Sequence, residues 1–122
     1  MGEKNNYRDL VVWQRGAIDL VPEVYQLVKK LPKEETYALG DQLRRAVVSI
    51  PANAAEGQAR QHHKEFLQHL SIAKGSLAEL HTLLTVAQKL GYVTPAQLEA
   101  MEQKLAEVAR PLNGLMSRLR RN

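Results

Sequence analysis

The sequence predicts an all-α fold, an antiparallel up-down four-helix bundle whose second helix is kinked at Pro51. Apolar residues recur with the 3.6-residue period of an α-helix in four separate stretches. Strand signals are nearly absent, because no run of β-branched residues alternates with polar ones. Long helices joined by short connections favour antiparallel neighbours. A chain of 122 residues has the size of one domain, so we expect a single domain over residues 1–122.

The first helix is predicted over about residues 8–30. Its inward stripe consists of Leu10, Trp13, Ala17, Val21, Val24, Val28 and Leu31. Pro22 lies inside this span, and we expect a bend there because proline removes a helical hydrogen bond. The segment LPKEET ends this helix and opens the next, with acids where the helix dipole favours them.

The second helix is predicted over residues 34–58, ending near Gly57, a natural C-terminal stop. Its inward stripe consists of Leu39, Leu43, Val47, Ile50 and Ala54. Pro51 cannot donate to the Val47 carbonyl, which predicts the kink. Ser49 and Asn53 offer side-chain hydrogen bonds nearby.

Small residues surround this proline, and they predict a close approach by another helix. They are Ala52, Ala54 and Ala55, with Gly75 of the third helix as the expected point of contact. We interpret Asn53 and Glu56 as buried structural residues. The alternative is that these two side chains face a groove used by a partner.

The third helix is predicted over residues 63–89 and the fourth over 95–120. The third buries Phe66, Leu70, Ala73, Leu77, Leu80, Leu84 and Ala87. The fourth buries Leu98, Met101, Leu105, Val108, Leu112, Leu115 and Leu119. Between them Gly91 stops one helix, Thr94 caps the next, and Pro95 occupies its first position. Pro111 should bend the fourth helix or split off its last two turns.

The third helix carries a second apolar arc, displaced by more than about 90° from its core stripe at 100° per residue. The arc consists of Ile72, Leu83, Val86 and Leu90. Long apolar ridges are uncommon on the surfaces of monomers, so we predict a subunit interface. The alternative is one wide apolar face that neighbouring helices cover.

The residues give no constellation for catalysis or metal binding. The absence of cysteine excludes disulfides and thiolate zinc sites. His62, Glu65 and His69 share a helical face, but no fourth ligand stands at a fixed spacing, so we interpret them as solvated polar residues. The chain lacks the Glu-x-x-His pairs of di-iron bundles, a nucleophile elbow and a phosphate loop. We therefore expect no enzyme, no metal and no cofactor.

The charge pattern favours contact with nucleic-acid phosphates. Residues 1–109 balance thirteen basic against thirteen acidic side chains, and the whole net charge of +4 lies beyond them. The excess cations are Arg110, Arg118, Arg120 and Arg121. A second basic set is Arg44, Arg45, Arg60 and Lys64. Aromatic residues make up only 5% of the chain, which leaves no obvious platform for stacking bases.

The longest apolar runs are much shorter than the ~18–20 residues of a membrane span. The first residues also lack the apolar region of a secretory signal. We expect a cytoplasmic protein without a membrane partner.

Three stretches carry a family resemblance: DLVVWQRG, LGDQLRRAVVSIPANAAEG and EFLQHLSIAKGSLAELHTLLTVAQKLGY. Over roughly residues 7–95 the chain resembles the four-helix-bundle proteins encoded in 23S rRNA intervening sequences. The resemblance implies a homopentamer and brings no catalytic residues. A related branch, the accessory proteins of diversity-generating retroelements, implies a basic surface for nucleic acid and a reverse transcriptase. The neutral charge of residues 1–109 departs from that basic pattern.

Two functions follow from the residues and the resemblance. The first is a non-enzymatic oligomer that binds RNA or DNA backbone. The second is an oligomeric scaffold for a protein partner, without nucleic-acid binding.

Overall fold

The protein is all-helical over the part of the chain that the structure describes. The computed structural model covers the backbone of residues 2–121 and the side chains of residues 11–121, so the predicted stripe residue Leu10 lies outside the described side chains. Residues 2–121 form α1 (Gly2–Lys29), the 3₁₀-helix η1 (Lys33–Glu35), α2 (Leu39–Gln58), α3 (His63–Lys89) and α4 (Pro95–Arg121), with no strand. The predicted all-α class is confirmed.

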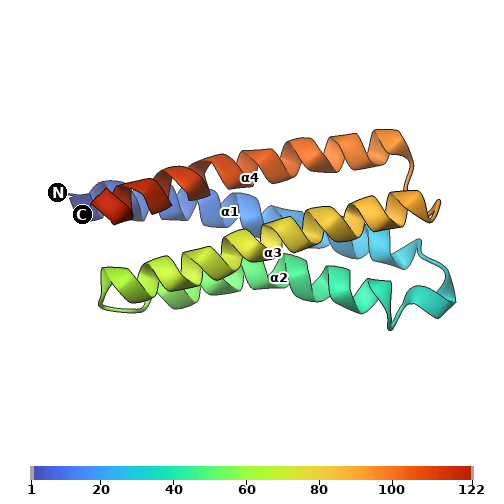
Figure 1. Cartoon of the computed structure of the whole chain (residues 1–122), viewed down its shortest axis with the longest axis horizontal. Coiled ribbons are helices and arrows are strands. Elements are labelled where there is room, and N and C mark those ends of the chain that lie inside the picture. The colour runs from blue at the N-terminus through green and yellow to red at the C-terminus, as the bar shows by residue number, and fades with distance from the viewer. Residues whose placement is uncertain (1, 122) are drawn as a thin grey trace.

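The four α-helices lie lengthwise beside one another (Figure 1). The α1–α2 and α3–α4 connections lie at one end of the molecule, and the α2–α3 connection lies at the other, together with the start of α1 and the end of α4 (Figure 1). Helices α1 and α3 each contact both α2 and α4. The bundle therefore has four seams, and α2 and α4 stand diagonally across its core.

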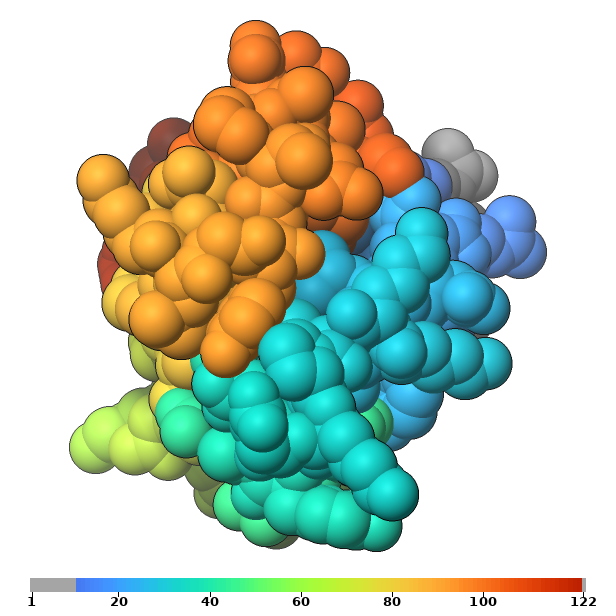
Figure 2. Space-filling model, turned by 90° about the vertical axis from the view of Figure 1, so that its right-hand side faces the viewer, coloured from blue at the N-terminus to red at the C-terminus, as the bar shows by residue number. Residues whose placement is uncertain are grey.

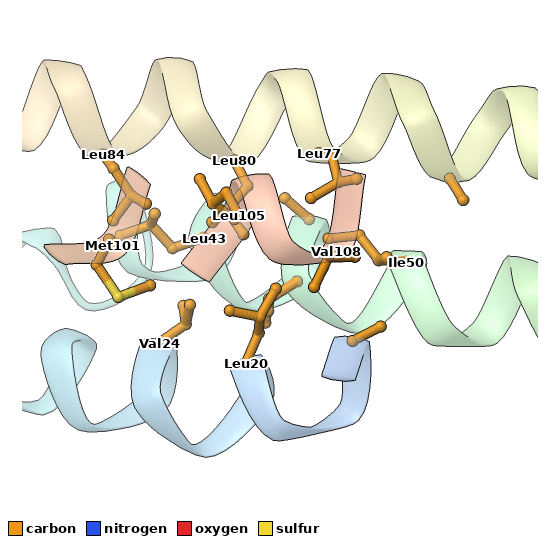
Figure 3. Packing of buried hydrophobic residues seen from close by; sticks show 14 of the residues in the cluster. Leu20, Val24, Leu43, Ile50, Leu77, Leu80, Leu84, Met101, Leu105 and Val108 are labelled. Atoms are coloured by element: carbon orange, nitrogen blue, oxygen red, sulfur yellow. The ribbon is translucent and has the colours of Figure 1, made fainter. Parts of the chain in front are cut away.

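One hydrophobic core draws residues from all four α-helices. Leu20 and Val24 of α1 point toward leucines of α2, α3 and α4 (Figure 3). The predicted stripes are buried at nearly every described position, while Val21, Phe66 and Leu98 are half-buried. Leu20 and Met116 are buried but were not predicted. Leu20 lies three residues after Ala17 and four before Val24, so it faces the core more directly than Val21.

The start of α2 differs from the expectation at residue 34. Residues 33–35 form a 3₁₀-helix, in which Glu35 N–H donates to the Pro32 carbonyl (2.9 Å) and Thr36 N–H donates to the Lys33 carbonyl (3.2 Å). These bonds span three residues rather than four, so the chain turns tightly before α2 begins at Leu39.

The predicted α3–α4 boundary is confirmed. Gly91 has a φ of 83°, and the N–H groups of Gly91 and Tyr92 donate to the carbonyls of Gln88 (3.0 Å) and Ala87 (2.9 Å). This is the Schellman pattern, which needs glycine at the left-handed position. Thr94 then caps α4: its Oγ1 accepts from Gln97 N–H (3.1 Å), and Gln97 Oε1 accepts from Thr94 N–H (2.8 Å).

Each internal proline lies within a continuous helix. Helix α1 continues through Pro22, α2 through Pro51 and α4 through Pro111. The last two turns of α4 are therefore not split off.

Helix α2 ends at Gln58, so the predicted end near Gly57 is confirmed. Gly57 does not act as the stop, because it lies buried inside the last turn without the positive φ of Gly91. A Cβ atom on Gly57 would lie 2.8 Å from the Cβ of His69 and 3.0 Å from Cδ1 of Phe66. By contrast, nothing lies within 4 Å of a Cβ placed on Gly75. The close approach of α2 and α3 therefore occurs at Gly57, where the absence of a side chain admits the first turns of α3.

Candidate functional site

Five of the predicted cations lie at one end of the bundle. Arg60 and Lys64 flank the α2–α3 connection, and Arg118, Arg120 and Arg121 lie in the last turn of α4. Both segments are at the same end of the molecule (Figure 1). Arg118 is half-buried, and the other four side chains are exposed. We call these five residues the basic end.

The arginines of α4 point in different directions around the helix. Glu102 contacts His81 of α3 (2.7 Å), and Arg120 follows Glu102 by 18 residues, or about five full turns. Arg120 is therefore on the side of α4 that faces α3. Lys104 forms an ion pair with Glu23 of α1, and Arg118 follows Lys104 by 14 residues, only ~40° away. Arg118 is thus on the α1 side, and the cations of the basic end are spread across it.

Arg60 is partly neutralised. Its Nη2 atom lies 2.6 Å from Oε1 of Glu56, and both side chains are about half exposed. The interpretation of Glu56 as a buried structural residue is therefore wrong, because its carboxylate reaches into solvent to meet the arginine one turn later. Lys64, also exposed, has no ion pair among residues 11–121.

The remaining predicted cations lie away from the basic end. Arg44 forms an ion pair with Asp41 and donates to the Thr36 carbonyl (2.9 Å), so it ties the α1–α2 connection to α2. Exposed Arg45 lies 13 residues, or ~20 Å, before the end of α2 at Gln58, and Arg60 follows that end. Exposed Arg110 lies ~16 Å before Arg121 on α4. Folding therefore does not gather the eight predicted cations into one patch.

The predicted apolar arc of α3 is exposed at three of its four positions. Ile72, Val86 and Leu90 expose 51%, 40% and 54% of their surface, whereas Leu83 exposes 9% and belongs to the core. Ile72 and Leu90 are 18 residues apart, so they share one side of the helix over ~27 Å. We call Ile72, Val86 and Leu90 the apolar ridge. Neighbouring helices cover Leu83 but not the ridge.

A polar cluster crosses the α2–α3 seam on either side of Pro51. Asn53 Nδ2 donates to the Ser49 carbonyl (2.9 Å), and its Oδ1 lies 3.2 Å from Nδ1 of His69. The hydroxyl oxygens of Ser49 and Ser76 are 2.8 Å apart. We call these four half-buried residues the seam cluster. Sequence reasoning identified Ser49 and Asn53 but not their partners on α3.

The interpretation of His69 as a solvated residue is wrong, because its half-buried ring contacts Asn53 of α2. Among the residues that the structure describes, no three His, Asp or Glu side chains are placed to hold a metal ion.

A second polar contact closes the opposite end of the bundle. Tyr92 Oη donates to Oε2 of Glu35 (3.0 Å), joining the α3–α4 connection to η1. The two connections lie against each other in the end view (Figure 2). The hydrogen bond to Glu35 is the main cause that raises the pKa of Tyr92 above its ordinary value, with burial and the charges of Glu35 and Glu34 adding to it.

None of the helices in the described part of the chain is long and apolar enough to cross a membrane.

The fold and surface define a small helical-bundle protein with a basic end. The family model of the 23S rRNA-intervening sequence proteins matches residues 8–114, and the chain belongs to this family.

A crystal structure from Bacteroides thetaiotaomicron, of a protein of unknown function in the S23 ribosomal protein family, shares the fold. The two are 23% identical, with a TM-score of 0.82 over 89% of this chain and 98% of the other. No curated protein matches the chain.

Proposed function

We propose that this protein is a non-enzymatic, homo-oligomeric helical bundle that binds the RNA or DNA backbone through its basic end. One observation carries the proposal. The entire net charge of +4 arises beyond residue 109, and three of the four arginines responsible lie at the same end as Arg60 and Lys64. The antiparallel up-down arrangement, with α2 bent at Pro51, is part of this proposal, as is a cytoplasmic location.

The chemistry of the basic end suits phosphate better than bases. Arginine presents a planar fork of donors that matches two phosphate oxygens. Near this end Phe66 is half-buried against Gly57, so its ring is not freely available for bases to stack on. Binding should therefore follow the backbone, depend strongly on salt and show little sequence preference.

Self-association would strengthen this binding. The apolar ridge supplies a surface that water disfavours, and the family resemblance implies five copies. Each added copy brings another basic end to the same ligand, which raises affinity by effective concentration without any new type of contact.

The test is a titration of structured rRNA fragments and duplex DNA at ~50 mM and ~200 mM salt. We expect binding that weakens steeply with salt. Replacing Arg118, Arg120 and Arg121 by Ala should lower the affinity and reduce the slope of log K against log salt by ~0.9 for each phosphate of B-DNA that is no longer neutralised. The matched control removes three exposed lysines at the opposite end, Lys30, Lys33 and Lys89, and should have a smaller effect.

Two results would count against the proposal. Absence of binding at low salt leaves the alternative function, an oligomeric scaffold for a protein partner without nucleic-acid binding. Equal reductions in affinity for the arginine and lysine variants show that the basic end is not the site.

A further inference from the structure

The seam between α3 and α4 is open to solvent along an apolar groove of about 350 Å³. The α2–α3 seam is closed instead, because the seam cluster and the close approach at Gly57 join these two helices. The α1–α4 seam has hollows too, but Glu23 lines both of them and pairs with Lys104 across the seam. The α3–α4 seam also has one contact across it, between His81 and Glu102 (2.7 Å), and this contact lies at one end of the groove. No other ion pair among residues 11–121 crosses the groove.

The groove has a leucine floor and alanine walls. Leu77, Leu105 and Leu112 form the floor, and each is at least nine-tenths buried. The walls carry Ala78 on α3 and Ala106 and Ala109 on α4. An alanine wall extends only to Cβ, so the backbone of a third helix is able to approach closely.

The two rows that line the groove have helix-packing periodicity. Along α3 the lining residues are 74, 78 and 81, and along α4 they are 102, 106, 109 and 113. Both rows alternate steps of four and three residues, the spacing that creates holes for the side chains of a facing helix. The longer row spans ~16 Å, or about three turns.

The two ends of the groove have different charges. At one end are the exposed side chains of Lys74 and Asn113, and Lys74 has no ion pair among residues 11–121. At the other end Glu102 contacts His81. A ligand lying along the groove would meet a cation at one end and a carboxylate at the other.

We propose that this groove binds an amphipathic α-helix of a partner protein. The apolar stripe of that helix packs on the leucine floor, an acidic side chain at one end pairs with Lys74, and a basic side chain at the other end faces Glu102. This is the helix-in-groove mode of recognition. The apolar ridge lies on the other side of α3, because Lys74 is ~200° around the helix from Ile72, so both surfaces are usable at once.

The test uses a fluorescent helical peptide of about 16 residues. Its leucines are spaced by three and four, with glutamates at one end and lysines at the other. A peptide of the same composition with scrambled leucines is the control, and a third peptide carries lysines at both ends. Fluorescence anisotropy measures each affinity for the full-length protein, and circular dichroism checks that every variant folds.

We expect the wild-type protein to bind the first peptide and not the scrambled one. Lys74→Glu should weaken this binding about tenfold. The same variant should bind the third peptide, with lysines at both ends, more tightly than the wild type does. Ala106→Phe fills the groove and should also weaken binding about tenfold. Ala96→Phe, on the exposed outer side of α4, should leave the affinity unchanged.

Equal binding of the first and scrambled peptides overturns the proposal, as does wild-type affinity in Ala106→Phe. If the peptide does not bind and Ala106→Phe instead lowers the mass measured by light scattering, the occupant is a second copy of this chain. In that case the partner-protein proposal is wrong.

Discussion

At the scale of single residues, two glycines of the bundle have opposite surroundings. Gly57 is buried where Phe66 and His69 press against α2, and a Cβ would overlap the Cβ of His69. Gly75 lies in the middle of α3 on its exposed side, and nothing lies within 4 Å of a Cβ placed there. The first glycine is required by packing, whereas the second leaves the helix backbone more flexible than an alanine would.

These surroundings predict opposite effects of the same substitution. Gly57→Ala should destabilise the protein by about 1–3 kcal/mol through overpacking. Gly75→Ala should stabilise it by about 0.5–1 kcal/mol, because glycine is a poor helix former. Urea unfolding followed by circular dichroism, at one fixed protein concentration, measures both. Similar shifts of the two midpoints in the same direction would contradict the packing assigned to Gly57.

At the scale of elements, the α1–α2 and α3–α4 connections hold each other at one end of the bundle. The Schellman turn at Gly91 and the capping box of Thr94 fix the second connection. The hydrogen bond from Tyr92 to Glu35 then ties it to the first. This contact joins residues 57 positions apart in the chain.

Tyr92→Phe should lower the Tm at neutral pH because it removes this bond. The raised pKa of Tyr92 sets the sign of the pH dependence. The stabilisation is fully present below the ordinary tyrosine value of 10.0 and is lost as pH rises through the raised value. The difference in Tm between wild type and variant should therefore shrink above pH ~10.

Tyr37→Phe is the matched control, because Tyr37 exposes 85% of its surface. It should leave the Tm unchanged at every pH. A Tm difference for Tyr92→Phe that stays constant into alkaline solution would exclude ionisation of Tyr92 as its source.

The elements were predictable to different degrees for physical reasons. Helical periodicity reports burial, so the core stripes followed from the sequence. The start of α2 could not be predicted from the sequence, because a 3₁₀-turn and an α-turn differ by one residue in hydrogen-bond span and favour similar residues. Gly57 was misinterpreted because glycine serves both as a helix stop and as a point of close approach, and only the neighbouring helix decides between them.

The candidate site was predictable only in its charges. The chain shows directly that residues 110–121 carry arginines without acids. The pairing of Arg60 with Glu56 has the i, i+4 spacing of a local ion pair, a signal present in the sequence. Contacts between helices, such as His69 with Asn53, depend on how α2 and α3 align, and no local pattern encodes them.

At the scale of the whole molecule, three surfaces with different chemistry occupy different regions. The basic end lies where α4 terminates, the apolar ridge lies along one side of α3, and the α3–α4 groove lies along the other. These regions do not overlap, so the proposed self-association and the two proposed ligands would not compete for one surface.

If the chain self-associates through the apolar ridge, placing charged side chains on the ridge should lower the mass of the particle in solution. Ile72→Glu combined with Val86→Glu should convert the proposed oligomer to a monomer, because carboxylates at the centre of an apolar interface lose their hydration. Size-exclusion chromatography with light scattering measures the mass. Val12→Glu, at a residue that exposes 69% of its surface on α1, should keep the wild-type mass. A wild-type monomer at micromolar concentration would refute the interface.

The seam cluster also sets how far α2 is shifted along α3. Leucine stripes repeat every turn, so apolar packing alone tolerates a slide of one turn, ~5.4 Å. Such a slide would separate the Ser49–Ser76 and Asn53–His69 pairs and carry Gly57 away from the first turns of α3. Half-buried polar groups would then be left without hydrogen-bond partners. A few polar atoms thus select one axial register from several that the hydrophobic core would accept.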